Sequence, residues 1–333
     1  MFLAASITGV IAATVIAFLV LTLLLVTLLL FTKQKLSPSG PVKITINGEK
    51  EIEVASGSTL LSTLGENKIF LPSACGGGGT CIQCECHVLE GGGEALPTET
   101  PHCSRKQLKD GARLSCQVKV KQNMNITIPE EVFGIKKWDA VVVRNYNVAS
   151  FIKEFVVEIP EDMNYKAGGY IQIEIPQCEV KFSDMDITAH PQEHDTPDKF
   201  QAEWDKFNLW PLVMKNTEVV ERAYSMASYP AEGREIMLNV RIASPPWDRA
   251  KNQWMDVNPG IASSYIFNLK KGDKCVISGP YGEFFINPSE SEMLYVGGGA
   301  GMAPMRSHLY HLFRTLKTGR TAVSYTHLTL PTN

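Results

Sequence analysis

Three cysteines and four consecutive glycines lie within ten residues, in the segment CGGGGTCIQC from Cys75 to Cys84. Thiolates are metal ligands, and glycine is costly to order, so this run indicates that the backbone itself comes close to a bound group. With Cys116 the spacing is C-x5-C-x2-C followed by one distant cysteine, a pattern that can hold a [2Fe-2S] cluster. Zinc is the alternative, but its structural sites usually pair two C-x2-C or C-x4-C units, and Cys116 has no such neighbour.

The remaining cysteines and the charge balance limit the other possibilities. Five of the eight cysteines fall between Cys75 and Cys103, which is too uneven for a disulfide framework. We interpret Cys86 and Cys103, which lie outside the ligand pattern, as buried or spare thiols. A formal net charge of -3 over 333 residues gives no reason to expect a nucleic-acid partner.

Two segments further along the chain have the residue types of a flavin site. In ERAYSMASYP, Arg222 offers a cation for phosphates, Tyr224 an aromatic plane, and Ser225 a small polar group for the reactive nitrogen. We take Tyr224 and Ser225 as the candidate catalytic residues. The plainer interpretation is a buried arginine and two strand residues. In NPGIASSYIF, a glycine and two serines begin a helical stretch, which suits phosphate binding at a helix N-terminus: Gly260, Ser263 and Ser264.

A third glycine-rich segment follows, in YVGGGAGMAPMR. It predicts a strand, a glycine turn and a helix, an arrangement that lets the backbone approach a pyrophosphate. The candidate residues for binding a pyrophosphate are its glycines, Gly297, Gly298, Gly299 and Gly301. Pro304 and Arg306 match the segment that opens the nicotinamide domain of the ferredoxin-NADP reductase superfamily, which this segment resembles, so the resemblance adds them as candidate binding residues.

Alternating segments predict the elements that position these groups. VKITINGEKEIEV, with Asn47-Gly48 at its centre, predicts a β-hairpin, and Ser58 is a plausible N-cap for a short helix. RLSCQVKV predicts a strand that carries Cys116, so we expect a small sheet packed against one helix. From about Phe133, strands without long helices predict an antiparallel barrel, its first two strands joined by an asparagine-rich turn.

An acidic insertion interrupts the barrel at residues 177–215. Between Gln177 and Lys206 it has eight acidic and three basic residues, and it is too long for a barrel turn, so it is a possible docking surface. His190 and His194 lie there. We interpret them as solvated loop histidines rather than metal ligands, because Pro191 separates them and no helix is evident.

The N-terminus predicts a membrane anchor. Residues 1–32 carry no charged side chain, and a bilayer-spanning helix needs ~20 apolar residues. A cleaved signal peptide is the alternative, but there is no basic region before the apolar run and no small-residue cleavage site after it. Lys33 and Lys35 follow directly, which predicts a single-pass membrane protein with Met1 outside and its remaining domains in the cytoplasm.

The chain is therefore predicted to be multidomain, with an N-terminal transmembrane helix, an α+β domain that resembles the ferredoxin-like β-grasp domains, an antiparallel β-barrel that resembles FAD domains and an incomplete α/β nucleotide-binding domain. The predicted boundaries are 1–36, 37–131, 132–287 and 288–333. A doubly wound domain needs several strand–helix units, and we find only one before Arg320. TAVSYTHLTLPTN does not have the pattern of a further strand and helix, so we expect residues 322–333 to be a non-native tail.

The cysteine segment and the LSCQ around Cys116 resemble the ferredoxin-like [2Fe-2S] domains. The Arg-x-Tyr-Ser segment, the Gly-x-x-Ser segment and GGGAGMAPMR, in this order, resemble the ferredoxin-NADP reductase superfamily. This resemblance implies FAD binding by Arg222, Tyr224, Ser225 and the Gly260–Ser264 segment, with the glycine turn opening a nicotinamide domain. Ala262 stands where several relatives have cysteine.

The order of anchor, [2Fe-2S] domain, FAD barrel and NADH domain resembles the F-subunit family of the bacterial sodium-translocating NADH:quinone reductases. The resemblance implies that NADH reduces FAD and that single electrons pass through the cluster to integral-membrane partner subunits, which reduce ubiquinone and move sodium. Two alternatives stay open at this point. One is a reductase component for an acceptor such as an oxygenase, and the other is an electron carrier without NADH activity.

Overall fold

The computed structural model describes residues 7–36 and 40–325 of the chain. The chain divides into two compact units. The first comprises residues 1–67 and 85–129, and the second comprises residues 68–84 and 130–333. The second unit therefore includes the segment 68–84, which carries Cys75, Cys81 and Cys84.

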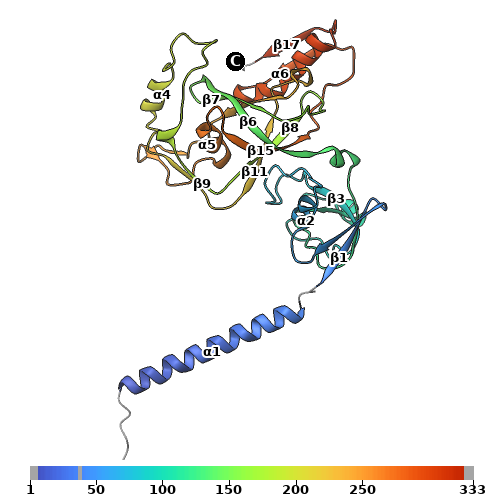
Figure 1. Ribbon diagram of the computed structural model, residues 1–333, viewed down its shortest axis with the longest axis vertical. Coiled ribbons are helices and arrows are strands. Elements are labelled where there is room, and N and C mark those ends of the chain that lie inside the picture. Colours follow the sequence, from blue (N-terminus) through green and yellow to red (C-terminus); the bar gives the residue numbers. More distant parts are fainter. Residues whose placement is uncertain (1–6, 37–39, 326–333) are drawn as a thin grey trace, which may run out of the picture. The chain divides into compact units, whose positions relative to one another are not determined.

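The N-terminal segment forms the predicted helix, α1, over Ile7–Leu36 (Figure 1). Its side chains from Ala13 to Leu29 are all exposed. The hydroxyl of Thr22 donates to the carbonyl of Phe18 at 2.8 Å, which satisfies its polar group within the helix. Within residues 7–36 and 40–325, no helix has both the length and the apolar character needed to cross a membrane.

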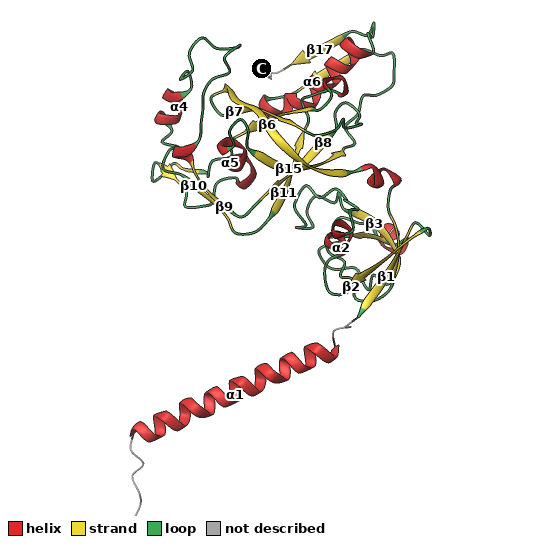
Figure 2. Ribbon diagram, in the orientation of Figure 1, coloured by secondary structure: helices red, strands yellow, loops and turns green. Residues whose placement is uncertain are grey.

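The first unit contains a five-stranded sheet, in the order β2-β1-β5-β3-β4. Strands β1, β2 and β3 of this sheet are labelled in Figure 2. The strand bounds are β1 Pro41–Ile46, β2 Lys50–Ala55, β3 Glu85–Glu90, β4 Ala112–Leu114 and β5 Met124–Thr127. Helix α2 (Leu60–Glu66) buries Leu60 and Leu64, and a short helix α3 spans Arg105–Lys109. The predicted hairpin is confirmed, because β1 and β2 pair antiparallel around Asn47 and Gly48, both at positive φ.

Two local predictions in this unit are wrong by a few residues. The N-cap of α2 is Thr59, whose hydroxyl accepts from the Ser62 N–H at 3.2 Å, and not Ser58. Cys116 does not lie in a strand, because β4 ends at Leu114 and the chain turns there. The turn is closed by the Gln117 N–H, which donates to the Leu114 carbonyl at 2.8 Å.

Six antiparallel strands form the core of the second unit, in the order β11-β8-β15-β6-β7-β12. Their bounds are β6 Lys136–Ala149, β7 Ile152–Glu158, β8 Tyr170–Ile175, β11 Val220–Ser225, β12 Glu235–Arg241 and β15 Lys274–Tyr281. The two edge strands meet where Met226 bridges Leu238 and the Ala227 N–H donates to the Met237 carbonyl at 2.7 Å. This closure confirms the predicted antiparallel barrel.

The first barrel turn lies later than predicted. The asparagines of the expected turn, Asn145 and Asn147, both belong to β6, and the chain reverses at Ser150 and Phe151. Asn145 is needed inside the strand, because its Nδ2 donates to the Ile266 carbonyl near the end of a later helix at 2.7 Å.

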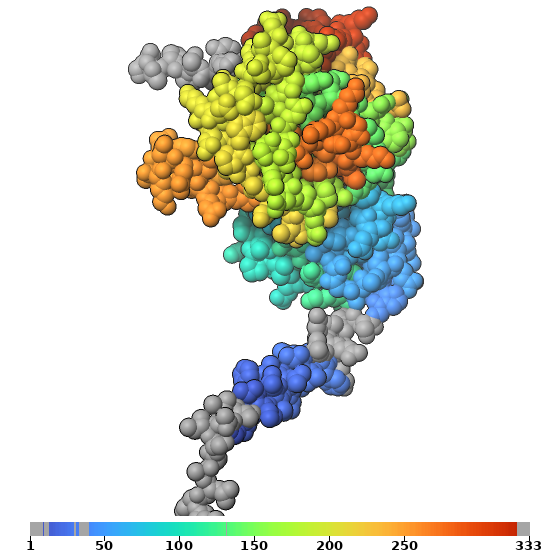
Figure 3. Space-filling view, turned by 60° about the vertical axis from the view of Figure 1, so that its left-hand side comes forward, coloured from blue at the N-terminus to red at the C-terminus, as the bar shows by residue number. Residues whose placement is uncertain are grey.

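The insertion at residues 177–215 packs against the barrel. It contains β9 (Cys178–Lys181), α4 (Gln201–Lys206) and β10 (Val213–Asn216), and the yellow and yellow-green surface of Figure 3 belongs largely to it. Phe182 and Trp204 are fully buried in the same apolar core as the barrel strands. The Trp204 Nε1 donates to the Ser150 carbonyl at 2.6 Å. The insertion therefore completes the core.

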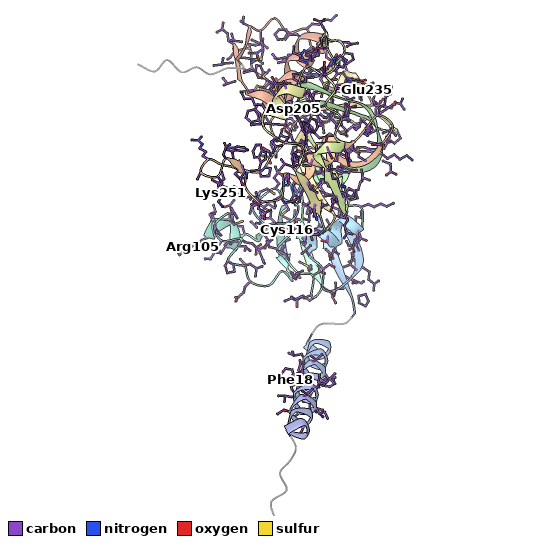
Figure 4. The ribbon with its side chains drawn as sticks, turned by 90° about the vertical axis from the view of Figure 1, so that its left-hand side faces the viewer. Phe18, Arg105, Cys116, Asp205, Glu235 and Lys251 are labelled. Carbon is purple, nitrogen blue, oxygen red and sulfur yellow. The ribbon has the colours of Figure 1, made fainter. Side chains whose placement is uncertain are left out.

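A short hairpin, β13 (Trp247–Asp248) and β14 (Gln253–Trp254), precedes helix α5 (Ile261–Asn268). The Trp254 Nε1 donates to the Phe207 carbonyl at 3.0 Å, which ties the hairpin to the insertion. Figure 4 shows the Lys251 loop at its tip standing out from the rest of the unit.

The last segment has one more strand than predicted. Its bounds are β16 Met293–Val296, α6 Met302–Tyr310 and β17 Ala322–Tyr325, with a π-helical turn at His311–Thr315. We expected no strand after Ala322, but β17 pairs in parallel with β16, Val323 opposite Leu294. A helix between two parallel strands provides the crossover that such pairing needs. The rest of the expected non-native tail, residues 326–333, lies outside the described residues.

Candidate functional site

The cysteine loop has the backbone conformation that its glycines predict. Gly76, Gly77 and Gly79 have φ values of 65°, 89° and 74°, a region that favours glycine. Ser73 organises the turn, because its carbonyl accepts from the Gly76 N–H at 3.0 Å and its hydroxyl from the Gly77 N–H at 2.9 Å. Ile82 also has a positive φ of 65°, which is unusual for a β-branched residue and marks backbone strain inside the loop.

Cys75 of the loop and two buried cysteines outside the ligand pattern, Cys86 and Cys103, have pKa values shifted in opposite directions. Burial raises the pKa of Cys75, but the backbone N–H groups of Thr80 and Cys81 outweigh it and lower that pKa to about 6. Burial raises the pKa of Cys86 to about 12 and also raises the pKa of Cys103. Near neutral pH, Cys75 is therefore a thiolate and Cys86 and Cys103 are neutral thiols, as expected for one ligand and two bystanders.

The donor chemistry fits an iron–sulfur cluster. In the first unit, the Gln117 Nε2 lies 3.3 Å from Cys116 Sγ, so this sulfur also has an amide donor. Donors of this kind stabilise negative sulfur and tune cluster potentials. Among the described residues, no three or more cysteine, histidine or acidic side chains are gathered as a metal site. The fit rests on the ionisation of Cys75 and on the hydrogen-bond donors to Cys75 and Cys116.

The Arg-x-Tyr-Ser segment lies at the end of a barrel strand, as predicted. Arg222, Tyr224 and Ser225 are the last residues of β11, which pairs with β8. Arg222 and Tyr224 are half-buried on one face of the strand, and Ser225 is exposed. Burial raises the pKa of Tyr224, so its phenol stays neutral. The segment can offer a cation, an aromatic ring and a hydroxyl in sequence.

Helix α5 begins where the sequence predicted a phosphate-binding turn. Gly260 is its N-cap, and a Cβ there would lie 2.5 Å from Ala243 Cβ, so only glycine fits. The Ser263 hydroxyl accepts from the Ala243 N–H and donates to the Gly260 carbonyl, both at 3.1 Å. The hydroxyl of Ser264 is buried without a hydrogen-bond partner. Ser263 therefore shapes the turn, and the orphaned Ser264 hydroxyl is the serine group left for a bound phosphate.

The glycine turn after β16 is partly open. A Cβ on Gly298 or Gly301 would meet nothing within 4 Å, whereas one on Gly297 would lie 2.6 Å from Met305 Sδ. Gly299 has a φ of 55° and begins a short turn that leads into α6, where Pro304 lies in the first helical turn. The turn therefore presents backbone to solvent at the start of a helix.

Arg306, predicted to bind a nucleotide, is engaged within the protein. It donates to the Ala227 carbonyl at 2.8 Å and forms an ion pair with Glu232 at 3.0 Å. Its guanidinium also lies 4.1 Å from the Tyr310 ring centre. These contacts tie α6 to the short turn Pro230–Glu232, so Arg306 orients the helix that follows the glycines.

The two histidines of the insertion differ from each other. His190 was predicted to be solvated, but it is buried, with Nε2 3.7 Å from Glu154 Oε1 and its ring edge against Tyr146. The prediction was wrong because β6 and β7 extend under this part of the insertion. His194 is half-buried, and its Nδ1 lies 3.1 Å from the Lys199 Nζ.

Sequence analysis missed the side chains that hold the cysteine loop in place. Within the second unit, Gln83 is hydrogen-bonded to Tyr170, and Gly76 lies against Arg222. No local pattern marks Gln83 or Tyr170, because the contact joins residues that are 87 positions apart.

Two family models match segments of this chain. Residues 44–121 match the family model of the 2Fe-2S iron-sulfur cluster binding domain, and residues 209–286 match that of the oxidoreductase FAD-binding domain. The chain is similar to the F subunit of the Na(+)-translocating NADH-quinone reductase of Pseudomonas aeruginosa (strain UCBPP-PA14), at 52% identity over 86% of this chain and 68% of the relative. The corresponding F subunit of Methylococcus capsulatus (strain Bath) is 53% identical over the same shares.

A solved structure supports the fold. The cytochrome P450 reductase GcoB of Amycolatopsis superposes with a TM-score of 0.53 at 19% identity, covering 86% of this chain and 72% of that one. At that identity the likeness shows the architecture alone.

Proposed function

Because this chain belongs to the family of Na(+)-translocating NADH-quinone reductase F subunits, we propose that it is the electron-input subunit of such a complex, oxidising NADH through FAD and a [2Fe-2S] cluster. When bound, FAD supplies the conversion between the two electrons of a hydride and the single electrons that the cluster accepts. The observation that carries the proposal is that one compact unit contains both the glycine-rich cysteine loop, in which backbone donors lower the pKa of Cys75, and the Arg-x-Tyr-Ser strand.

Each group has candidate residues in this chain. Cys75, Cys81, Cys84 and Cys116 would hold the cluster as thiolates. Arg222 would neutralise FAD phosphate, while the N-terminus of α5, with Gly260 and Ser264, would take its pyrophosphate. Tyr224 would lie against the flavin ring and Ser225 would approach its reactive nitrogen.

The nicotinamide side rests on the glycine turn. The open backbone at Gly298 and Gly301 suits a close approach of the NADH pyrophosphate, at the positive end of α6. Arg306, bound to Glu232, would keep α6 in the orientation that this approach needs.

The family assignment also implies association with the other subunits of a membrane complex, which would reduce ubiquinone and transport sodium. Helix α1 exposes large apolar side chains from Val15 to Leu29, as an anchor in the bacterial inner membrane would. In this proposal the soluble domains lie in the cytoplasm. The test is alkaline carbonate extraction of membranes that contain the full chain or a variant lacking residues 1–36. Extraction of the full chain into the soluble fraction would refute the anchor.

The enzymatic proposal is tested by anaerobic titration of the detergent-purified chain with NADH, followed by flavin absorbance and by EPR. Bleaching of the flavin together with growth of a reduced [2Fe-2S] signal supports it. Reduction of both centres by dithionite but not by NADH would leave an electron carrier and refute NADH oxidation by this chain.

A further inference from the structure

The cysteine loop is seated on two strands of the flavin barrel by three separate contacts within the second unit. At the start of the loop, the Gln172 side-chain amide is oriented so that its nitrogen donates to Glu221 Oε2. Its oxygen then accepts from the Ser73 N–H at 2.6 Å. In the middle, Gly76 lies so close to Arg222 that a Cβ would be 2.7 Å from Nη1. At the end, the Tyr170 hydroxyl bonds to Gln83 Oε1 at 3.0 Å.

Tyr170 is a fixed point of the barrel. It is the first residue of β8, where it lies opposite Ser225 in β11 and opposite Tyr281 in β15. Its ring stacks on the ring of Tyr281, with centres 5.3 Å apart and planes 22° apart. The Tyr281 hydroxyl in turn donates to Ser278 Oγ at 3.0 Å, in a buried position. The ring therefore has little freedom to move.

Gln83 connects the cysteine loop to Tyr170 and also connects the two ends of the loop to each other. Its Oε1 accepts both from the Tyr170 hydroxyl and from the Ala74 N–H, the latter at 3.2 Å. Ala74 adjoins Cys75, and Gln83 adjoins Cys84. One oxygen therefore closes the loop on itself and attaches it to the strand residue opposite Ser225. Gln83 is exposed, so this contact adds little apolar burial and serves mainly to position the loop.

We propose that Tyr170 and Gln83 are positioning residues that hold the cluster-binding loop at a fixed place on the flavin strands. This inference rests on the proposed function. Electron transfer between two centres slows steeply as their separation grows, so a fixed seat for the loop keeps the transfer step fast and uniform. In this role both residues act through the loop.

The test uses the full chain, purified in detergent with FAD and cluster bound, and the variants Tyr170→Phe and Gln83→Ala. Tyr281→Phe is the matched control, since it removes a hydroxyl from the same stacked pair that points to Ser278 and not to the loop. The first readout is hydrogen–deuterium exchange of peptides covering residues 72–84. We expect about fivefold faster exchange in both variants, as for loss of one hydrogen bond, and no change in the control.

The second readout is independent of NADH. FAD is reduced by a laser flash with a deazaflavin donor, and oxidation of the flavin by the cluster is followed by absorbance. We expect transfer at least threefold slower in both variants, with unchanged cluster EPR parameters. Unchanged exchange, or faster exchange with transfer at the wild-type rate, would overturn the proposal. So would loss of the EPR signal in Gln83→Ala, since the residue would then act on cluster assembly. Wild-type protein without an EPR signal or FAD would refute the proposed function instead.

Discussion

Gly76 and Arg222 are in direct contact, although one belongs to the cysteine loop and the other to the flavin-type strand. Gly76 has a φ of 65°, and a Cβ there would lie 2.7 Å from Arg222 Nη1. The guanidinium is held at this place because Nη1 also donates to the Glu221 carbonyl at 2.8 Å. Any side chain added to Gly76 must therefore push the arginine away.

Gly76→Ala should weaken FAD binding about tenfold, the effect of disturbing one charge-assisted hydrogen bond. Titration of the flavin-free chain with FAD, followed by flavin fluorescence, measures this. Gly78→Ala is the matched control, because its Cβ would make ordinary contacts of 3.6–4.0 Å with Cys75 only. Equal affinities for the two variants would show that Arg222 does not bind the cofactor from this position.

Replacing Cys75, Cys81, Cys84 or Cys116 with alanine should abolish the EPR signal of the reduced cluster while bound FAD is retained. Cys86→Ala and Cys103→Ala should keep the signal, because the pKa of both thiols is raised by burial and neither ionises near neutral pH. EPR of dithionite-reduced protein and flavin content per chain are the measurements. Loss of the EPR signal in Cys86→Ala or Cys103→Ala would show that the proposed set of cluster ligands is wrong.

Gly260→Ala should release FAD and leave the cluster intact. The new Cβ would lie 2.5 Å from Ala243 Cβ and 2.9 Å from Ser263 Oγ, so the start of α5 must move by overpacking, at a cost of about 1–3 kcal/mol. FAD content after gel filtration measures the effect. Gly134→Ala, where a Cβ would meet nothing within 4 Å, should keep wild-type content. Retention of FAD by both variants would contradict the phosphate site.

Lys153 predicts an unusual dependence of stability on pH. Its side chain is fully buried and donates to the Asn145 carbonyl at 2.9 Å, and burial lowers its pKa to about 8 from 10.5. Between these values the unfolded chain binds more protons, so stability rises with pH, by about 3 kcal/mol at most. Below the lower value the full cost of the buried charge is present.

The control variant is Lys153→Met, which lacks the titrating amine. Its unfolding free energy should not show the pH dependence that comes from Lys153, while all other groups titrate as in the wild type. Urea unfolding at pH 7.5 and pH 10, followed by tryptophan fluorescence, isolates the second unit, because all five tryptophans lie in it. From pH 7.5 to pH 10, the free energy of unfolding of the wild type should rise relative to that of Lys153→Met. An equal change with pH in both proteins would mean that Lys153 keeps an ordinary pKa.

Features fixed by short-range chemistry were predictable from the sequence. The Asn47-Gly48 hairpin and the Gly260 helix start follow from turn and cap preferences of adjacent residues. Features that depend on distant partners were missed. Tyr170 meets Gln83 across 87 positions, His190 is buried by strands from another part of the chain, and β17 becomes a strand only by pairing with β16. Local residue preferences contain no information about such partners.

The buried anchors of the insertion have a consequence for how the family can diverge. Phe182 and Trp204 fill the barrel core, and Trp254 and Asn258 tie the neighbouring hairpin to the insertion's backbone. Evolutionary insertions and deletions should therefore be absent from the two ends of the insertion (residues 177–215) and from α4. They should concentrate at residues 191–199, which are exposed apart from the half-buried His194, and at the hairpin tip near Lys251, where no core side chain would be displaced.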